Sequence, residues 1–454
     1  MIIRDLRKVM PVMAGTVLWM TGDAAWAQDT ASAATVATAE AAGVAPETAF
    51  ILNTLLFLMT GFLVMFMAAG FAMLEAGLVR KRSVGTQCLK NIALFAIAGI
   101  MYHLVGYNLM YSGVDGGWIG SFAVWSPDDT AAAAGDYSAG YAASSDWFFQ
   151  MVFVATAASI VSGTMAERVK VWPFLLFVVV LTGFIYPITG SWQWGGGWLK
   201  ELGFSDFAGS TLVHSVGGWA ALVGGVLLGA RNGRFTRDGR SQPMPGSSLP
   251  LATLGTFILW LGWFGFNGGS QLALGSGADA IAVANIFINT NIAACGGVVA
   301  AMFASNLLFR KIDLTLALNG AIGGLVAITA EPLTPSLGAA VSIGAIGGVL
   351  VVVTVPILDR LKIDDVVGAI PAHLVCGVWG TMAVPLTNGD ATFLTQAAGV
   401  FAVAAFTILT SGIVWLALRS TTGIRIHEED EAMGIDQAEM GMDAYPEFGP
   451  GTVA

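Results

Sequence analysis

Charged side chains are scarce in this sequence. Asp, Glu, Lys and Arg together make up 11% of its 454 residues, whereas hydrophobic residues make up 56%. A soluble globular protein carries about 25% charged residues, so this composition excludes one large water-soluble core. The net charge of −10 also argues against a nucleic-acid binder, which would show a basic face. Repeated apolar stretches of about 20 residues, each long enough to cross a ~30 Å hydrocarbon layer, instead predict an all-α integral membrane protein in a lipid bilayer.

Cysteine is rare as well. The three cysteines, Cys88, Cys295 and Cys376, are scattered and odd in number, which favours neither a disulfide framework nor a metal site. No predicted loop combines a nucleophile with a base, so we do not expect an enzyme. We expect no cofactor either.

The two ends of the chain differ from its apolar middle. Residues 1–27 join a positively charged start, an apolar run and an A-x-A site, which is the pattern of a secretory signal peptide; a weak first helix is the alternative. Residues 28–49 are Ala/Thr-rich and are expected to form a disordered periplasmic segment. Residues 50–418 hold the membrane domain. The tail, residues 419–454, has eight acidic residues after position 425 and is either a solvated acidic end or a cytoplasmic regulatory element.

Eleven apolar spans can be marked in the membrane domain. Signal cleavage would place the new N-terminus outside, in the periplasm, and eleven crossings would place the C-terminus in the cytoplasm. Basic residues agree, because 16 of the 20 Lys and Arg fall in the predicted inside loops and tail, and Lys200 alone falls in the predicted outside loops. We therefore expect a multi-pass membrane protein with its N-terminus outside and its C-terminus inside. The spans are residues 50–76, 91–113, 146–166, 172–191, 209–230, 249–272, 281–308, 314–330, 337–357, 367–385 and 392–418.

A short motif occurs twice, in spans five and ten. "DFAGSTLVHSVGG" begins at Asp206 and "DVVGAIPAHLVCG" begins at Asp365, and both fit D-x2-G-x4-H-x-V-x-G. Because five spans separate the copies, the two halves cross the membrane in opposite directions. The sequence therefore predicts a 5+5 inverted-topology repeat plus an eleventh helix, an arrangement whose functional site lies near the midplane between the repeats.

The repeated motif carries a histidine in each copy. His214 and His373 lie eight residues past their aspartates, or roughly 12 Å along a helix, so both are expected near the middle of the membrane and able to meet. The alternative is that each histidine separately satisfies a backbone carbonyl. Ionisable groups inside a membrane are functional candidates. His103 has no repeat partner and is interpreted as structural.

Aromatic residues gather near the predicted outer face. An aromatic belt at the lipid headgroups explains Trp192 and Trp198, but it explains residues one to two turns further inward poorly. The alternative is a cation site, because aromatic faces attract small cations with ~2 kcal/mol when desolvated. The residues that orientation and helical spacing bring together there are Phe149, Phe153, Trp194, Asp206, Trp263, Phe266 and Ser270.

The lining near His214 selects among cations. Potassium needs a dense set of oxygen ligands to replace its water, and "TLVHSVGGW" offers almost none. Ammonium can lose a proton and continue as neutral ammonia, past two neutral imidazoles that share a proton. An outer cation site followed by an apolar passage with paired histidines therefore points to ammonium.

At these residues the sequence resembles the Amt/Mep/Rh ammonium transporter family, and specifically its bacterial Amt-type members. The resemblance covers about residues 50–446. It rests on "GFAMLEAGLVRKRS", "GTMAERVK", "DFAGSTLVH", "GWFGFNGGS", "DDVVGAIPAHLVCG" and "IRIHEEDEAMGIDQAEMGMDAY". It implies a homotrimer with one pore per subunit, ammonium or its analogue methylammonium as substrate, and an inner face that binds a PII-family signalling protein.

The resemblance also implies roles for individual residues. The substrate recruitment site would consist of Phe153, Trp194 and Ser270, supported by Asp206, and the phenyl gate of Phe153 and Phe266. His214, His373 and Trp263 would line the pore. Some members carry Phe-Tyr where this chain has Leu74 and Glu75. Glu75 is expected to pair with basic residues of the next loop, with proton handling as the alternative.

Two other functions stay open at this point. An ammonium sensor would signal to a PII-type partner and transport little, although sensors of this family often carry an additional C-terminal domain and this tail is short. A transporter of another small amine would need a wider pore than paired Phe and His suggest.

Overall fold

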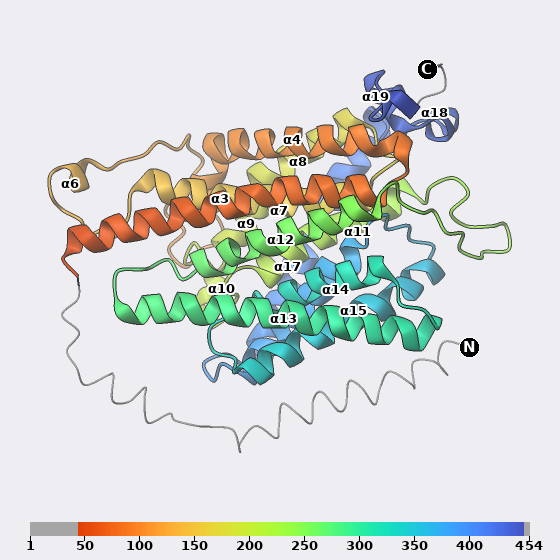
Figure 1. Ribbon diagram of the computed structural model, residues 1–454. Helices are drawn as coiled ribbons and strands as arrows, with labels where there is room; N and C mark the ends of the chain where they lie inside the picture. Colours follow the sequence, from red (N-terminus) through yellow and green to blue (C-terminus); the bar gives the residue numbers. More distant parts are fainter. Residues whose placement is uncertain (1–43, 449–454) are drawn as a thin grey trace.

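The computed structural model describes residues 44–448, and they form one bundle of roughly parallel and antiparallel helices (Figure 1). The predicted signal peptide lies outside the described residues. Among these residues nine helical segments are long and apolar enough to cross a membrane, and two further apolar helices are shorter, Leu314–Ile328 and Ile370–Leu386. Each of the eleven predicted spans coincides with one of these segments, and the ends differ by several residues. The first helix begins at Pro46, inside the segment expected to be disordered.

The helices run in the following order. The first half of the bundle contains α3 (Pro46–Leu78), η2 (Lys81–Ser83), α4 (Val84–Met101), η3 (Tyr102–Gly106), α5 (Tyr107–Tyr111), α6 (Thr130–Ala133), α7 (Ala143–Thr164), α8 (Val171–Val180), η4 (Leu181–Ile185), α9 (Tyr186–Ser191), α10 (Trp198–Glu201), η5 (Ser210–Ser215) and α11 (Val216–Leu228). The second half contains α12 (Leu249–Gly269), α13 (Gly277–Phe309), α14 (Leu314–Ile328), α15 (Leu337–Arg360), η6 (Ile370–Val375), α16 (Cys376–Ala383), η7 (Val384–Leu386) and α17 (Phe393–Thr421), followed by α18 (Glu428–Met433), α19 (Ile435–Met440) and η8 (Pro446–Phe448).

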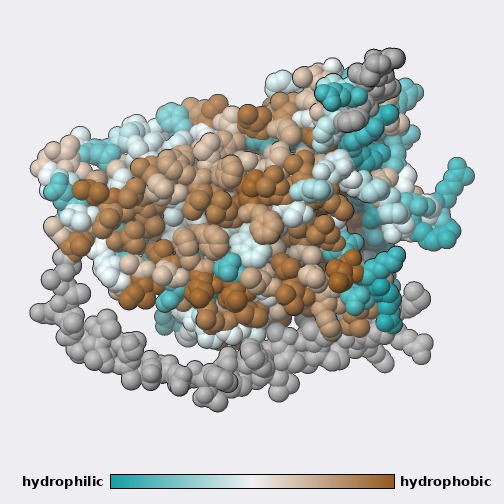
Figure 2. Space-filling model, in the orientation of Figure 1, coloured by the Kyte–Doolittle hydropathy of each residue, from teal (hydrophilic) through white to brown (hydrophobic). Residues whose placement is uncertain are grey.

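The surface of the bundle is that of a membrane protein. Large apolar side chains face outward along the sides of the helices, for example Phe401 at 74% exposure and Ile92 at 71%. Hydrophilic residues gather at the two ends (Figure 2). We call the end with α18 and α19 the tail end, on the right in Figure 1, and the end where α3 begins the opposite end.

The two copies of the repeated motif fold alike. The first glycine of each copy has a positive φ, 108° for Gly209 and 80° for Gly368, which ends the preceding segment with a turn that other residues adopt with strain. A π-helical turn follows each glycine, η5 in one copy and η6 in the other, and each turn holds the motif's histidine. Wide turns of this kind often occur at functional sites.

The second motif glycine lets the two copies cross closely. A Cβ atom at Gly218 would lie 2.6 Å from Leu374 Cβ and 2.8 Å from its backbone, and a Cβ at Gly377 would lie 2.5 Å from Ser215 Oγ. Each glycine thus contacts the histidine-bearing turn of the other copy. Small residues allow such close approach of helices in membranes.

We therefore expect Gly218→Ala to destabilise the protein by about 1–3 kcal/mol, because the added methyl group must push Leu374 and its turn aside. Thermal unfolding of the purified protein in detergent measures this. Gly412→Ala is a matched control, since a Cβ there would meet its first neighbour, Val223, at an ordinary 3.8 Å. Equal melting temperatures for Gly218→Ala and the control would contradict the close crossing.

A cluster of charged residues holds the loops together at the tail end. Arg231 lies 2.8 Å from Asp364 and 2.7 Å from Glu167, and all three are buried. Burial alone would raise the pKa of Asp364, but hydrogen bonds from Arg231 and the charges of Arg231 and Arg168 hold it well below its usual range. The loop after α11 is thereby fixed to the segments before α8 and η6.

The acidic tail is docked on this end of the bundle. The Asp436 carboxylate accepts hydrogen bonds from the backbone N–H groups of Gly85 (2.9 Å) and Thr86 (2.7 Å), at the start of α4. Glu439 accepts one from Val171 N (2.8 Å), the first residue of α8. Carboxylates stabilise helix N-termini because they satisfy free N–H groups and complement the helix dipole. The simple solvated end considered above is therefore wrong for this part of the tail.

Candidate functional site: a histidine pair below stacked aromatic rings

Asp206 builds the turn that positions His214. Its buried carboxylate accepts four backbone hydrogen bonds, from the N–H groups of Gly209 (3.1 Å), Ser210 (2.8 Å), Thr211 (2.9 Å) and Leu212 (2.9 Å). These are the free N–H groups at the start of a helix, which a side-chain acceptor must satisfy when they are buried. In the second copy, Asp365 accepts from Ile370 N (2.7 Å) and from the hydroxyl of Thr164 (3.0 Å).

The two histidines meet in the middle of the bundle. The Nδ1 atoms of His214 and His373 are 3.2 Å apart, and the residues are 0% and 3% exposed. A hydrogen bond between two Nδ1 atoms requires one to carry the proton and the other to accept it, so neutral rings adopt opposite tautomers. The prediction that the repeat brings the two imidazoles together is confirmed, and the alternative of two separate carbonyl contacts is wrong for Nδ1.

The second ring nitrogen of His214 has no partner within the described part of the protein. Within residues 44–448, Nε2 of His214 is buried and has no hydrogen-bond partner. A buried polar atom without a partner costs about 1–3 kcal/mol. The rings of Trp263 and Phe266 stack on His214 at centroid distances of 4.9 Å and 5.2 Å, which keeps its surroundings apolar.

Aromatic rings continue from the histidines toward the opposite end. Phe266 lies against Phe153 with ring centroids 4.0 Å apart, and Phe153 meets Trp194 edge-on at 6.4 Å. Phe153 and Phe266 are buried, whereas Trp194 and Ser270 are half-buried. The predicted residues thus form a continuous series that leads through two phenyl rings to the histidine pair. We call its partly exposed end, at Trp194 and Ser270, the mouth.

Two other residues predicted for this site, Ser270 and Asp206, form hydrogen bonds to the protein backbone. The Ser270 hydroxyl donates to the carbonyl oxygen of Phe266 (2.8 Å), so its oxygen keeps its lone pairs for another donor. The Asp206 carboxylate is occupied by backbone N–H groups, and its carbonyl oxygen accepts from the Trp194 indole (2.9 Å). Asp206 therefore supports the site by holding the turn and the Trp194 ring in place.

The remaining aromatic and histidine residues that the sequence singled out lie apart from the histidine pair. Trp192 and Trp198 contact each other and Trp118 near the opposite end, away from the ring series. Trp192 is buried, so its place in an aromatic belt stays a prediction. His103 is exposed on the bundle surface, so its interpretation as structural stays a prediction. Phe149 lies beside Phe153 at 4.8 Å and stacks on Phe57, so it supports the mouth from behind.

The sequence analysis did not identify one supporting residue, and it did not name the partner of another. The Thr329 hydroxyl accepts from the Trp263 indole (2.8 Å) and so fixes the ring that stacks on His214; no motif marked it. Glu75 was expected to pair with a basic residue of the next loop, and its partner is Lys90, seven residues into α4.

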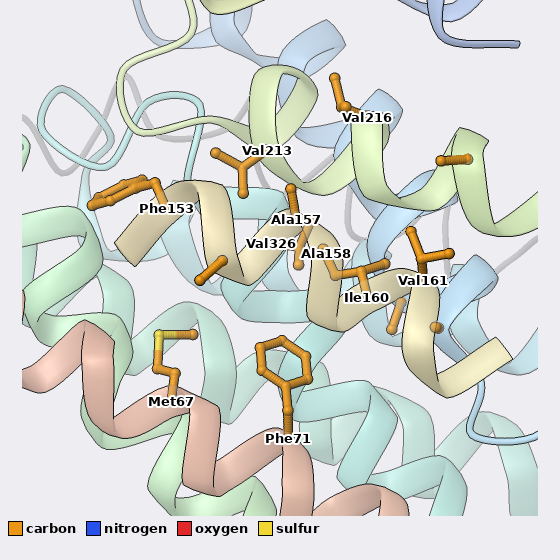
Figure 3. Packing of buried hydrophobic residues seen from close by; sticks show 14 of the residues in the cluster. Met67, Phe71, Phe153, Ala157, Ala158, Ile160, Val161, Val213, Val216 and Val326 are labelled. Atoms are coloured by element: carbon orange, nitrogen blue, oxygen red, sulfur yellow. The ribbon is translucent and has the colours of Figure 1, made fainter. Parts of the chain in front are cut away.

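Apolar side chains pack between the phenyl rings and the tail end. Figure 3 shows Met67 and Phe71 of α3 pointing toward α7, where Phe153 lies at one end of the row and Ile160 further along it. The Phe71 ring lies 6.0 Å from that of His373. In the described part of the chain, no group of three His, Cys, Asp or Glu residues could hold a metal ion. Apolar surroundings of this kind suit a small molecule that is uncharged.

Comparisons with known proteins agree with one another. The family model described as Ammonium Transporter Family matches residues 55–445. The chain is 40% identical to ammonium transporter Amt2 of Archaeoglobus fulgidus, across 86% of this chain and 87% of that protein. It is 39% identical to ammonium transporter Amt1 of Haloferax mediterranei, across 87% and 80% respectively.

Solved structures with this fold are similar too. A structure described as a sensor Amt protein matches with a TM-score of 0.80 and 33% identity, covering 86% of this chain and 98% of that one. Mep2 of Candida albicans matches with a TM-score of 0.73 and 26% identity, covering 88% and 92%.

Proposed function

We propose, from the premise that the chain belongs to the ammonium transporter family, that it recruits ammonium at the aromatic mouth, removes a proton and conducts ammonia past the histidine pair. The family makes it a multi-pass membrane transporter protein rather than an enzyme. The observation that carries the finer mechanism is the pair of buried imidazoles, 3.2 Å apart at Nδ1, below two stacked phenyl rings.

The mouth is suited to a small cation. The faces of Phe153 and Trp194 attract positive charge, and the Ser270 oxygen accepts a hydrogen bond from it. Below the mouth, Phe153 and Phe266 fill the path, and a permanent ion would lose its hydration there without gaining oxygen ligands. Ammonium avoids that cost because it can give up its proton, and methylammonium shares this property.

The histidine pair offers ammonia hydrogen bonds that suit a neutral molecule. Opposite tautomers leave one Nε2 as acceptor and the other as donor, which matches a molecule with N–H groups and one lone pair. The same pair can accept a proton at one end and release one at the other, so the proposal holds with or without a relayed proton.

Orientation and partners follow from the family and from the charge pattern. We place the tail end in the cytoplasm and the aromatic mouth in the periplasm of a bacterial inner membrane, because the basic residues gather at the tail end. A homotrimer and a PII-family partner are carried over from the family. The docked tail supports such a partner, since it presents the exposed acidic residues Glu428 and Glu429 on a fixed surface.

Sensing is the second candidate, favoured by the close structural match to a sensor Amt protein. A sensor would bind ammonium at the same mouth and change the tail end without sustained flux. Transport and sensing therefore differ in flux, not in binding.

We expect an ammonium pulse to produce a current or a lumenal pH change in proteoliposomes on a solid-supported membrane. A potassium pulse of equal ionic strength should produce none. Ammonium binding without flux above that of empty liposomes would favour the sensor, and absence of both would overturn the proposal.

A further inference from the structure

A buried carboxylate lies on the tail-end side of the histidine pair. Glu75 of α3 is 1% exposed, and it lines the same narrow internal cavity as His373. The cavity has room for roughly one water-sized molecule, about 10 Å³ for the centre of such a molecule. A buried water needs two to four polar partners, and Ser159 and Asn319 line the cavity beside Glu75 and His373.

The rest of this cavity is apolar. Phe71 and Ile160, which Figure 3 shows on facing helices, form its walls together with Leu74 and Ile322. Glu75 is therefore the carboxylate that a proton leaving His373 meets within this cavity.

A buried lysine accompanies the carboxylate. Lys90 Nζ lies 3.9 Å from Glu75 Oε2 and donates to the carbonyl oxygen of Ser162 (2.9 Å). The hydroxyl of Ser162 and the amide of Asn91 donate to the two Glu75 oxygens, at 2.8 Å and 3.1 Å. A buried ion pair is weak evidence for stability, since apolar residues often replace one without loss, and intramembrane ionisable residues usually serve function.

We propose, building on the transport function proposed above, that Glu75 returns the proton to ammonia at the tail end of the pore. The histidine pair takes one proton from the entering ammonium at His214 and releases one from His373 to a water in the cavity, so both rings stay neutral, while that water passes one of its own protons to the Glu75 carboxylate. Ammonia that has passed the pair then takes this proton, so that a new N–H bond forms, the carboxylic O–H bond breaks and the carboxylate is regenerated. One ammonium therefore leaves for each ammonium that entered, and one positive charge crosses with each nitrogen.

Lys90 has a distinct part in this step. Ammonium formed beside a bare buried carboxylate would be held tightly by its charge. The lysine ammonium group neutralises most of that attraction, because it lies at ion-pair distance from the same carboxylate. Glu75 can then exchange a proton without trapping the product.

Glu75→Gln tests the proposal when the transported charge and the transported nitrogen are measured separately. The full-length variant in proteoliposomes would be assayed for ammonium- or methylammonium-evoked current and for uptake of radiolabelled methylammonium under a clamped potential. We expect the charge carried per methylammonium delivered to fall about tenfold or more, while uptake per folded protein stays within a few-fold of the parent. Glu75→Gln/Lys90→Met, which removes the unpaired lysine charge, should show the same loss if the single variant folds poorly.

Asp146→Asn is the matched control. Asp146 is a buried carboxyl residue on α7 that is bonded to Tyr107 and Gln150 and does not line the cavity, so its charge-to-nitrogen ratio should equal that of the parent. A merely structural role for Glu75 would lower current and uptake together and leave the ratio unchanged, which would overturn the proposal. A parent that carries nitrogen without charge would overturn it as well, whereas a parent with no flux would refute the transport function itself.

Discussion

Replacing both His214 and His373 with alanine is expected to abolish ammonium-selective transport. The buried pair lies between the phenyl rings and the cavity at Glu75, and its ring nitrogens can contact a polar molecule there. Two alanines would leave a gap that water can enter, so potassium could cross hydrated. A charge at the bilayer centre costs ~2.5–3.5 kcal/mol, which corresponds to about 100-fold in selectivity, and that factor should be lost.

Ammonium and potassium pulses on the same proteoliposomes measure this prediction. The double variant should give either no ammonium response or equal responses to both cations. Each single variant should also be impaired, because it leaves the remaining Nδ1 buried without its partner. His103→Ala is the matched control, since His103 is an exposed histidine outside the pair. A double variant that conducts ammonium like the parent and excludes potassium would show that the pair does not select.

The repeat explains why the sequence predicted the centre of the site well. Each histidine lies eight residues past an aspartate, and the two spans cross in opposite directions. This spacing determines how deep each histidine lies in the membrane and from which face its span enters. Depth and direction were enough to predict contact between His214 and His373, and the structure confirms it. Helical spacing similarly predicted that Trp263 and Phe266 share a face, and both stack on His214.

The same reasoning could not predict the wide turns around the histidines. Helical periodicity assumes 3.6 residues per turn, whereas η5 and η6 are π-helical and rotate the following residues relative to that expectation. The sequence does contain a partial signal, since a glycine precedes each turn. It does not reveal that the aspartate three residues before the glycine binds backbone N–H groups with its carboxylate rather than a cation.

Contacts between distant segments account for most of what was missed. Asp436 caps α4 from about 350 residues away, and no local pattern distinguishes such a cap from an acidic residue in solvent. Thr329 is similar, because its bond to Trp263 depends on how α12 and α14 lie together. The depth of Lys90 follows from the packing of α4 against α7, which the charge of the preceding loop does not reveal.

Asp206→Ala is expected to have the second large effect, on folding as well as transport. The variant leaves four buried backbone N–H groups without an acceptor. Each such group costs about 1–3 kcal/mol, and proteins have only about 5–15 kcal/mol of stability in total. The turn that carries His214 should therefore lose its structure, and folded yield, melting temperature in detergent and ammonium current should all drop.

Two further variants separate the hydrogen bonds from the charge. Asp206→Asn keeps one oxygen that can accept two of the four N–H groups, while its amide group faces the others, so it should fall between the parent and Asp206→Ala. Asp365→Ala, in the second copy of the motif, loses two acceptor contacts that the structure records, to Ile370 and Thr164, and should be the mildest of the three. This order follows from the number of N–H groups left unsatisfied. If Asp206→Asn were as inactive as Asp206→Ala yet as stable as the parent, the carboxylate would act through its charge on ammonium instead of through the turn.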